Sequence, residues 1–318
     1  MSPRPGCLKP VLFGCLSLLG LVVLIAVVTV LVTWQTVGKQ DVVDREAASP
    51  ADLASSQPAV VEAPSLAPAT AGTREQSVPP GPGRIVLDLN QCEFQLRPAR
   101  EGEGVTVKAR FDQSVHELRE SFEALPDSTW VYRVGFRRTI TGLQALALAL
   151  TGRHGSAKIE IWLPPAHPFA LDVSLHQGGS EIELGGLWLT DVAVSYDQGG
   201  MAIAVSEPLQ EPVARFSLRG RMGGVTASRL GNASPRELDI GCAMGGADID
   251  LRGAWRGDCW AQASVRMGGI NLTVPAEMQV RDAAEAPPLA APQAQELAAP
   301  TLWLKTAANM GEVEVIRR

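Results

Sequence analysis

Side chains that could do chemistry are few in this 318-residue chain, and their spacing matches no familiar site. Histidine occurs only at His116, His154, His167 and His176, without the H-x-x-x-H or Cys/His spacing of metal sites. The sequence has no Ser/His/Asp arrangement, nucleophile elbow, phosphate-binding glycine loop or dinucleotide fingerprint. We therefore expect a protein that is not an enzyme and that uses no cofactor and no metal.

Carboxylates and tryptophans are the remaining candidates for binding. The carboxylates recur in pairs at equivalent positions of a repeat, at Glu181/Glu183, Asp248/Asp250 and Glu312/Glu314. They could bind calcium, although a solvated face that blocks strand pairing is the reading we prefer. Trp162 and Trp303 fall on outward positions of predicted strands and could form a recognition patch for a glycan or a protein. Burial of these rings beneath loops is the alternative.

The elements that must position these side chains come from a glycine repeat. Pairs of glycines recur at intervals of 21, 24, 22 and 23 residues, at Gly178/Gly179, Gly199/Gly200, Gly223/Gly224, Gly245/Gly246 and Gly268/Gly269. A fixed period in this range is typical of a solenoid. Aliphatic residues stand at odd positions before each first glycine and at even positions after it. Because strand side chains alternate between faces, this pattern predicts two strands per unit, joined by a turn at both glycines of the pair.

We therefore predict an all-β, repetitive β-solenoid with rungs of about 22 residues. An antiparallel meander, with each glycine pair at a hairpin tip, is the alternative. The unit around Gly223 fits less well and suggests a bulge. Asn309 could replace the first glycine of a last rung, with residues 283–300 looped out before it. One further rung is expected near Ala157.

Upstream of the repeat the pattern is less regular. Alternation between Ile85 and Phe111 predicts strands, and Thr129 to Arg137 predicts another. Val115 to Leu125 could form a short helix capped by Ser114. Ile140 to Leu150 is apolar on most faces and predicts a buried helix that covers the open end of the stack.

The amino-terminal region predicts a membrane anchor. Val11 to Trp34 carries no charge and is long enough to span a ~30 Å hydrocarbon core. A cleaved signal peptide is the competing interpretation, but the run is longer than its usual apolar core. Basic residues before the run place residues 1–10 in the cytoplasm and the rest of the chain outside. Residues 35–83, rich in Ala and Pro, predict a flexible tether, and residues 84–318 the extracytoplasmic solenoid.

Charge and cysteine content narrow the partners. The net charge of −6 argues against a nucleic-acid partner. Cys92, Cys242 and Cys259 lie beyond the anchor, so at most one disulfide forms there. A bridge between Cys242 and Cys259 on neighbouring rungs is possible, but their offsets from the glycine pairs differ.

Several motifs resemble a known bacterial family. The run Ile159-Glu-Ile-Trp-Leu-Pro164, followed by Phe169-Ala-Leu-Asp-Val173 and Glu181-Ile-Glu-Leu-Gly185, resembles the putative-adhesin family and its toast-rack relatives. Those relatives include the C-terminal domain of LiaF-like cell-wall stress regulators. The resemblance implies a β-solenoid-like fold outside a bacterial cell, without known catalysis, in envelope stress sensing or regulation. The single anchor departs from the several spanning helices typical of the regulators.

These observations favour a non-catalytic, single-pass envelope protein. Its solenoid would bind a protein or a cell-wall glycan, in envelope sensing, regulation or adhesion. The alternative is a structural scaffold that assembles end to end through exposed strand edges.

Overall fold

The computed structural model describes residues 67–69, 73–79, 81–140, 157–286 and 299–318. Its strands belong to one compact unit, Val43–Arg138 with Ser156–Arg318. Over these described residues there is no α-helix, and the strands join one 15-stranded sheet. This part of the chain is therefore all-β, as the repeat predicts.

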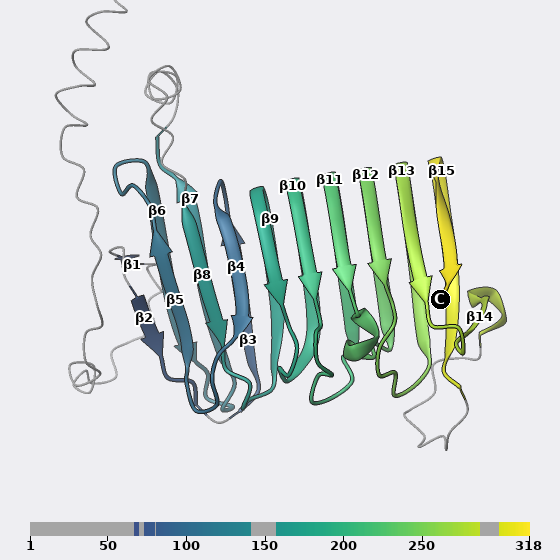
Figure 1. The fold of residues 1–318 in the computed structure, drawn as a ribbon. Coiled ribbons are helices and arrows are strands. Elements are labelled where there is room, and N and C mark those ends of the chain that lie inside the picture. The colour runs from purple at the N-terminus through teal and green to yellow at the C-terminus, as the bar shows by residue number, and fades with distance from the viewer. Residues whose placement is uncertain (1–66, 70–72, 80, 141–156, 287–298) are drawn as a thin grey trace, which may run out of the picture. The chain divides into compact units, whose positions relative to one another are not determined.

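The predicted repeat units are long strands that stack as rungs. They are β9 (Phe169–Glu183), β10 (Leu189–Ala204), β11 (Arg215–Ser228), β12 (Glu237–Asp250), β13 (Cys259–Val274) and β15 (Thr301–Arg317). Each is parallel to its neighbour and in register at the glycines, so that Gly199 lies between Gly178 and Gly223. Figure 1 shows the rungs side by side in sequence order. Parallel pairing of consecutive units fits a solenoid-like stack and not the antiparallel meander.

Each rung bends at its glycine pair. In β9, Leu171, Val173 and Leu175 are buried before the bend and Ile182 after it, so the inward parity changes as predicted. We call the outer surface over the parts before the bend the leading face, and that over the parts after it the trailing face. The prediction of two strands per unit was wrong, because the pairing of neighbouring rungs resumes at the glycines and each rung is one strand.

Glycine is required at the bend by two constraints. Gly223 has a φ of +130°, a conformation that residues with a Cβ rarely adopt. A Cβ at this position would also lie 1.9 Å from the carbonyl oxygen of Gly199 on the preceding rung. The bend therefore depends on the first glycine of each pair.

The second glycine of each pair is not the turn residue that the sequence predicts. Gly179 and Gly200 lie inside β9 and β10, where they pair with each other in register. Neither has a positive φ, and a Cβ on either would meet nothing within 4 Å. Gly224, Gly246 and Gly269 likewise lie inside their strands without a positive φ. The prediction was wrong for these five residues, because the first glycine makes the bend and regular pairing has resumed at the second.

The core consists of ladders of like residues. Leu171, Val192, Phe216, Leu238 and Ala261 share one register position, and all are buried. Because parallel strands lie ~4.8 Å apart, each side chain packs on the equivalent residue of the next rung. Full burial of one large aliphatic or aromatic side chain stabilises the fold by about 1.5–3 kcal/mol. The stack is therefore held together mainly by contacts between neighbouring rungs.

The rungs before β9 are split into pairs of shorter strands. These are β1 (Ala67–Ala69) with β2 (Thr73–Gln76), β5 (Val105–Arg110) with β6 (His116–Ala124), β7 (Trp130–Arg138) with β8 (Lys158–Leu163), and β3 (Gly83–Leu89) with β4 (Glu93–Pro98). β3 and β4 pair in parallel with β9, and β7 and β8 pair with them in turn. β6 and β5 are antiparallel to β7 and β8, and so are β1 and β2 to β6 and β5. Spatial order therefore differs from sequence order here.

Several local predictions need correction. The helix expected at Val115–Leu125 is strand β6, because antiparallel pairing with β7 supplies its backbone hydrogen bonds. No bulge interrupts β11, where Ala227 stays in register between Ile203 and Ile249. Leu230, which fell one place late, is instead buried in the 3-10 helix η2 (Leu230–Ala233).

The last rung is shifted relative to its prediction. Gly311, and not Asn309, pairs with Gly268. The residues expected to loop out are preceded by β14 (Gln279–Asp282), which pairs with the start of β15, and begin with the 3-10 helix η3 (Ala283–Glu285). The rung expected near Ala157 exists as β8, but β4 separates it from β9.

The predicted anchor at 11–34, most of the tether at 35–83 and the predicted helix at 140–150 lie largely or wholly outside the described residues. β1 and β2 fall inside the range expected for the tether, so strands begin before residue 84. In the described part of the chain, no helix has the length and apolar character needed to cross a bilayer.

Candidate functional site

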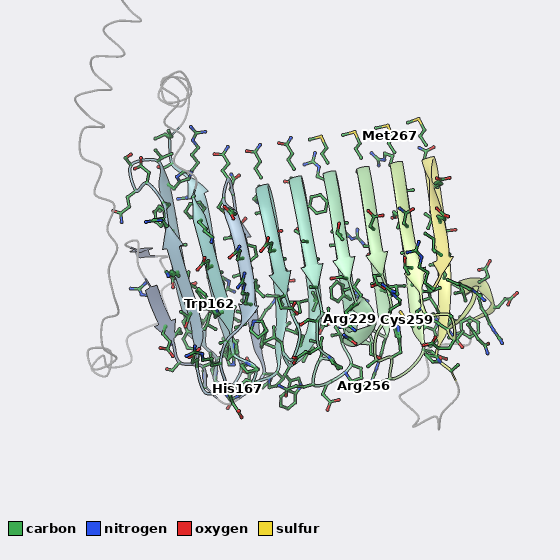
Figure 2. The ribbon with its side chains drawn as sticks, in the orientation of Figure 1. Trp162, His167, Arg229, Arg256, Cys259 and Met267 are labelled. Carbon is green, nitrogen blue, oxygen red and sulfur yellow. The ribbon has the colours of Figure 1, made fainter. Side chains whose placement is uncertain are left out.

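The two predicted recognition residues lie on different faces of the stack. Trp162 is in β8, where Arg97 and Thr106 are its neighbours on adjacent strands of the trailing face. Trp303 is in the first part of β15, on the leading face. Figure 2 shows Trp162 toward the N-terminal rungs and Cys259, which pairs with Leu302, toward the C-terminal rungs. Trp162 and Trp303 therefore do not form one patch.

The structure instead places a second tryptophan beside Trp303. Trp260 of β13 pairs with Trp303 of β15, so the two rings occupy the same position on rungs ~4.8 Å apart. Trp303 is 7% exposed, and the guanidinium of Arg281 lies 5.8 Å from its ring centroid. Trp260 is only half-buried. It is therefore the accessible aromatic surface of the pair.

Sequence reasoning missed Trp260, although the repeat contained the signal. Both tryptophans stand eight residues before the first glycine of their own rung, Gly268 and Gly311. The parity of the repeat already made Trp260 an outward residue. Taking Asn309 as the reference shifted Trp303 by two residues, which kept its parity but hid its alignment with Trp260.

A groove of about 530 Å³ lies over the leading face between β10 and β15. The two tryptophans line it together with Arg215, Ser217, Arg219, Glu237, Asp239, Gln262 and Lys305. Ala283 of η3 contributes to its wall, so the segment between β13 and β15 shapes the groove. Because strand alternation directs the side chains of the rungs outward, the register of the rungs brings the strand residues of the groove together.

The charges of the groove are arranged as ion pairs. Arg215 donates to Glu237 through Nε at 2.8 Å and Nη2 at 2.6 Å, and Arg219 donates to Asp239. The hydrogen bond with Glu237 raises the pKa of Arg215, which stays charged. Both groove carboxylates thus have an arginine partner, unlike the free acid that general acid catalysis needs.

Other groups of the groove have unused hydrogen-bonding capacity. Among the described residues, Gln262 and Lys305 make no side-chain hydrogen bond, and the buried Nε1 of Trp303 has no partner. An apolar ring beside polar groups suits a ligand with one apolar and one polar surface. A sugar ring has this character, since its C–H face packs on an aromatic ring while its hydroxyl groups form hydrogen bonds.

The cysteines and the candidate metal ligands are separated. Cys92, Cys242 and Cys259 are buried free thiols, and burial raises the pKa of Cys92 to about 12. Cys242 pairs with Val265 while Cys259 pairs with Leu302, so the bridge left open by the sequence is not formed. Across the ranges that the structure describes, no three His, Cys, Asp or Glu side chains are grouped as a metal site.

The predicted carboxylate pairs do not converge either. Glu181 and Asp248 share one register position, but Ala202 and Thr226 lie between them on the intervening rungs. Asp250 accepts hydrogen bonds from Arg252 at 2.9 and 3.0 Å. These side chains form a solvated outer surface in the described rungs.

Comparison with known proteins places the chain near no characterised family. No family model matches it, and no curated protein matches it. Similar solved structures include a putative cell adhesion protein from Clostridium sporogenes, with 10% identity and a TM-score of 0.38 over 79% of this chain and 100% of that one. A putative adhesin from Bacteroides fragilis has 11% identity and a TM-score of 0.28 over 77% of this chain and 96% of that one. These values are too low to assign the chain to a family.

Proposed function

We propose that the chain is a non-catalytic envelope protein, anchored by residues 11–34, whose solenoid lies outside the membrane and binds a cell-wall glycan. The alignment of Trp260 with Trp303 in a groove of polar side chains carries the proposal. Gln262 and Lys305 supply donors and an acceptor beside the ring of Trp260. The ion pairing of Glu237 and Asp239 supports binding, without catalysis, as the proposed role of this groove.

The length of the predicted tether determines how far from the membrane the groove can bind. Because β1 begins at Ala67, about 32 residues of the predicted tether remain, and a flexible chain of that length spans on average about 28–34 Å. The groove would then sample the layer next to the membrane, where a wall polymer can be sensed or held. Reporter fusions on either side of residues 11–34 test the orientation, since an enzyme active only outside the cytoplasm must work after residue 34 and fail before residue 11.

The binding proposal is tested with the full-length chain in detergent and purified peptidoglycan as the probe. Wild-type protein is expected to cosediment with the polymer and to be displaced by soluble wall fragments. Trp260→Ala removes the accessible ring and is expected to weaken binding at least tenfold, about 1.4 kcal/mol or more.

Trp162→Ala is the matched control, because Trp162 is half-buried like Trp260 but lies on the trailing face. Equal loss in both variants would exclude the groove as the binding site. If the chain binds a protein fraction through Trp260 but binds neither peptidoglycan nor other wall polysaccharides, the partner is a protein and not a glycan.

The open edge of β15 favours self-assembly as a second candidate function. β14 pairs only with Thr301–Leu304, and within the described residues the rest of β15 pairs with β13 alone. Val315, at 37% exposure, lies on this stretch, which pairs with β13 on one side only. Light scattering on the chain from residue 67 onward should show concentration-dependent growth that Val315→Lys abolishes. A strict monomer at every concentration would exclude the scaffold.

A further inference from the structure

Four methionines form a ladder along the bent edge of the stack. Met222, Met244, Met267 and Met310 each precede the first glycine of their rung, and each pairs in register with the next. We call these residues the methionine ladder. Figure 2 shows a row of sulfur-bearing side chains along the edge where Met267 is labelled.

Three of the four ladder residues are exposed and Met267 is half-buried, so core packing does not explain the ladder. Met222, Met244 and Met310 are 36%, 39% and 64% exposed, and they are three of the five exposed large hydrophobic side chains in the described residues. The second glycines of the pairs, beside the ladder, carry no side chain that could cover it.

The same edge shows that methionine is not required by the backbone. On the preceding rungs, the ladder position holds Gln198 and Gln177, and Gln91 follows at the corner between β3 and β4. These amides form a chain of hydrogen bonds, from Gln91 to Gln177 and from Gln177 to Gln198, each of 2.8 Å. A polar side chain therefore fits this position. The change to thioethers over the last rungs calls for a chemical explanation.

Thioether sulfurs are neutral, polarizable donors that select soft cations, of which Cu(I) is the biological example. Neighbouring rungs place successive methionines ~4.8 Å apart. Three rotatable bonds per side chain let adjacent sulfurs lean toward a shared ion. A neutral site needs no nearby carboxylate. Arg221, which flanks the ladder, is already paired with Asp197.

We propose that the methionine ladder binds a soft monovalent cation, Cu(I) in the cell and Ag(I) as its redox-stable analogue. Met244 and Met267, at the centre of the ladder, each donate a sulfur to the ion. Met222 or Met310 donates the third sulfur. The ion adds to the thioethers without bond cleavage or electron transfer. This site is independent of the groove around Trp260, which lies on the leading face.

The test follows the methionine methyl groups of the full-length chain by NMR during titration with silver nitrate in chloride-free buffer. Cys7→Ser and Cys15→Ser are introduced first, because thiols compete for silver; Cys92, Cys242 and Cys259 are buried. The ladder methyl signals are expected to shift together and to saturate. Met201 and Met278 are internal controls, since both are buried away from the ladder and should not shift.

Met244→Leu with Met267→Leu keeps the volume and apolar character of the ladder centre but removes its sulfurs. The remaining Met222 and Met310 are then three rungs apart, about 14 Å, too far to share an ion. Silver affinity is expected to fall at least tenfold, with unchanged Met201 and Met278 signals as proof of folding. Unshifted ladder methyl signals in the wild type, or equal affinity in this variant, would overturn the proposal.

Discussion

Protonated His176 links its own rung to the rungs on both sides. Its Nδ1 lies 2.9 Å from Oδ2 of Asp197, and its Nε2 lies 2.9 Å from Oδ1 of Asp88. The hydrogen bond with Asp197, and then that with Asp88, raises the pKa of His176 above its ordinary value. Protonated His176 therefore stabilises the fold fully below its unfolded pKa of ~6.5, and this contribution is lost as the pH rises through the folded value.

The change His176→Gln should remove this pH dependence. Because 47% of the side chain is exposed, we expect the wild type to exceed the variant by at most about 0.5 kcal/mol at pH 6 and by less at pH 9. Urea unfolding at the two pH values measures the difference. His167→Gln, which removes a histidine without such carboxylate partners in the described residues, controls for general effects. A gap between wild type and His176→Gln that is equal at both pH values would contradict the assignment.

Asn232 is a second residue whose single side chain joins several rungs. It is 6% exposed, its amide nitrogen donates to the carbonyl of Val205 at 2.8 Å, and its side-chain oxygen accepts from the backbone of Ala254 at 2.9 Å. Asn232→Ala removes the amide donor from the buried Val205 carbonyl and should cost about 1–3 kcal/mol. The exposed Asn309→Ala should stay within about 0.5 kcal/mol of the wild type in the same denaturation assay. Equal stability of the two variants would show that water replaces the amide.

At the scale of the element, the two adjacent glycines of a bend have different roles. Gly223→Ala forces a Cβ at φ +130° to within 1.9 Å of the Gly199 carbonyl oxygen, whereas Gly224→Ala meets nothing within 4 Å. We expect Gly223→Ala to lose at least ~2–3 kcal/mol by backbone strain and by disruption of the rung contact. Gly224→Ala should change the stability by less than ~1 kcal/mol. Thermal unfolding of the pair checks this, and similar midpoints would show that the bend relaxes without glycine.

The elements that the sequence could predict are those whose pattern is local. From Gly178 to Gly269, the glycine pairs and the parity of their flanks placed the inward residues correctly, because every rung pairs with its neighbour in sequence. The pattern did not show which glycine of a pair bends the chain, since that depends on φ and on the carbonyl of the preceding rung. The earlier rungs could not be ordered in this way. There β8 pairs with β4 and β5, contacts that depend on long-range partners and carry no repeat.

The site was harder to predict than the core for the same reason. Outward parity identified Trp303, but its partner depends on the register of β15, and the single Gly311 gave a weaker marker than a glycine pair. The groove also includes Ala283 of η3, an element that the Ala/Pro-rich composition did not predict. Function here depends on the register between rungs, which a pattern within one rung does not contain.

At the scale of the whole stack, stability should fall toward the open end. The middle rungs β10, β11 and β12 have neighbours on both sides, while β15 after Leu304 pairs with β13 alone among the described strands. In a stack held by nearest-neighbour contacts, an end rung opens without its neighbours, and its outer N–H groups have no ladder partner.

Hydrogen exchange on the full-length chain should therefore show the slowest amides in β11 and much faster exchange in Gly311–Arg317. Dilution distinguishes the two proposed arrangements of this edge. If the last rung is free, its exchange rate is independent of protein concentration. If a second copy pairs with it, protection appears at high concentration and is lost on dilution or in Val315→Lys. Protection equal to that of β11 at every concentration would contradict both, because the edge would then be covered by the chain itself.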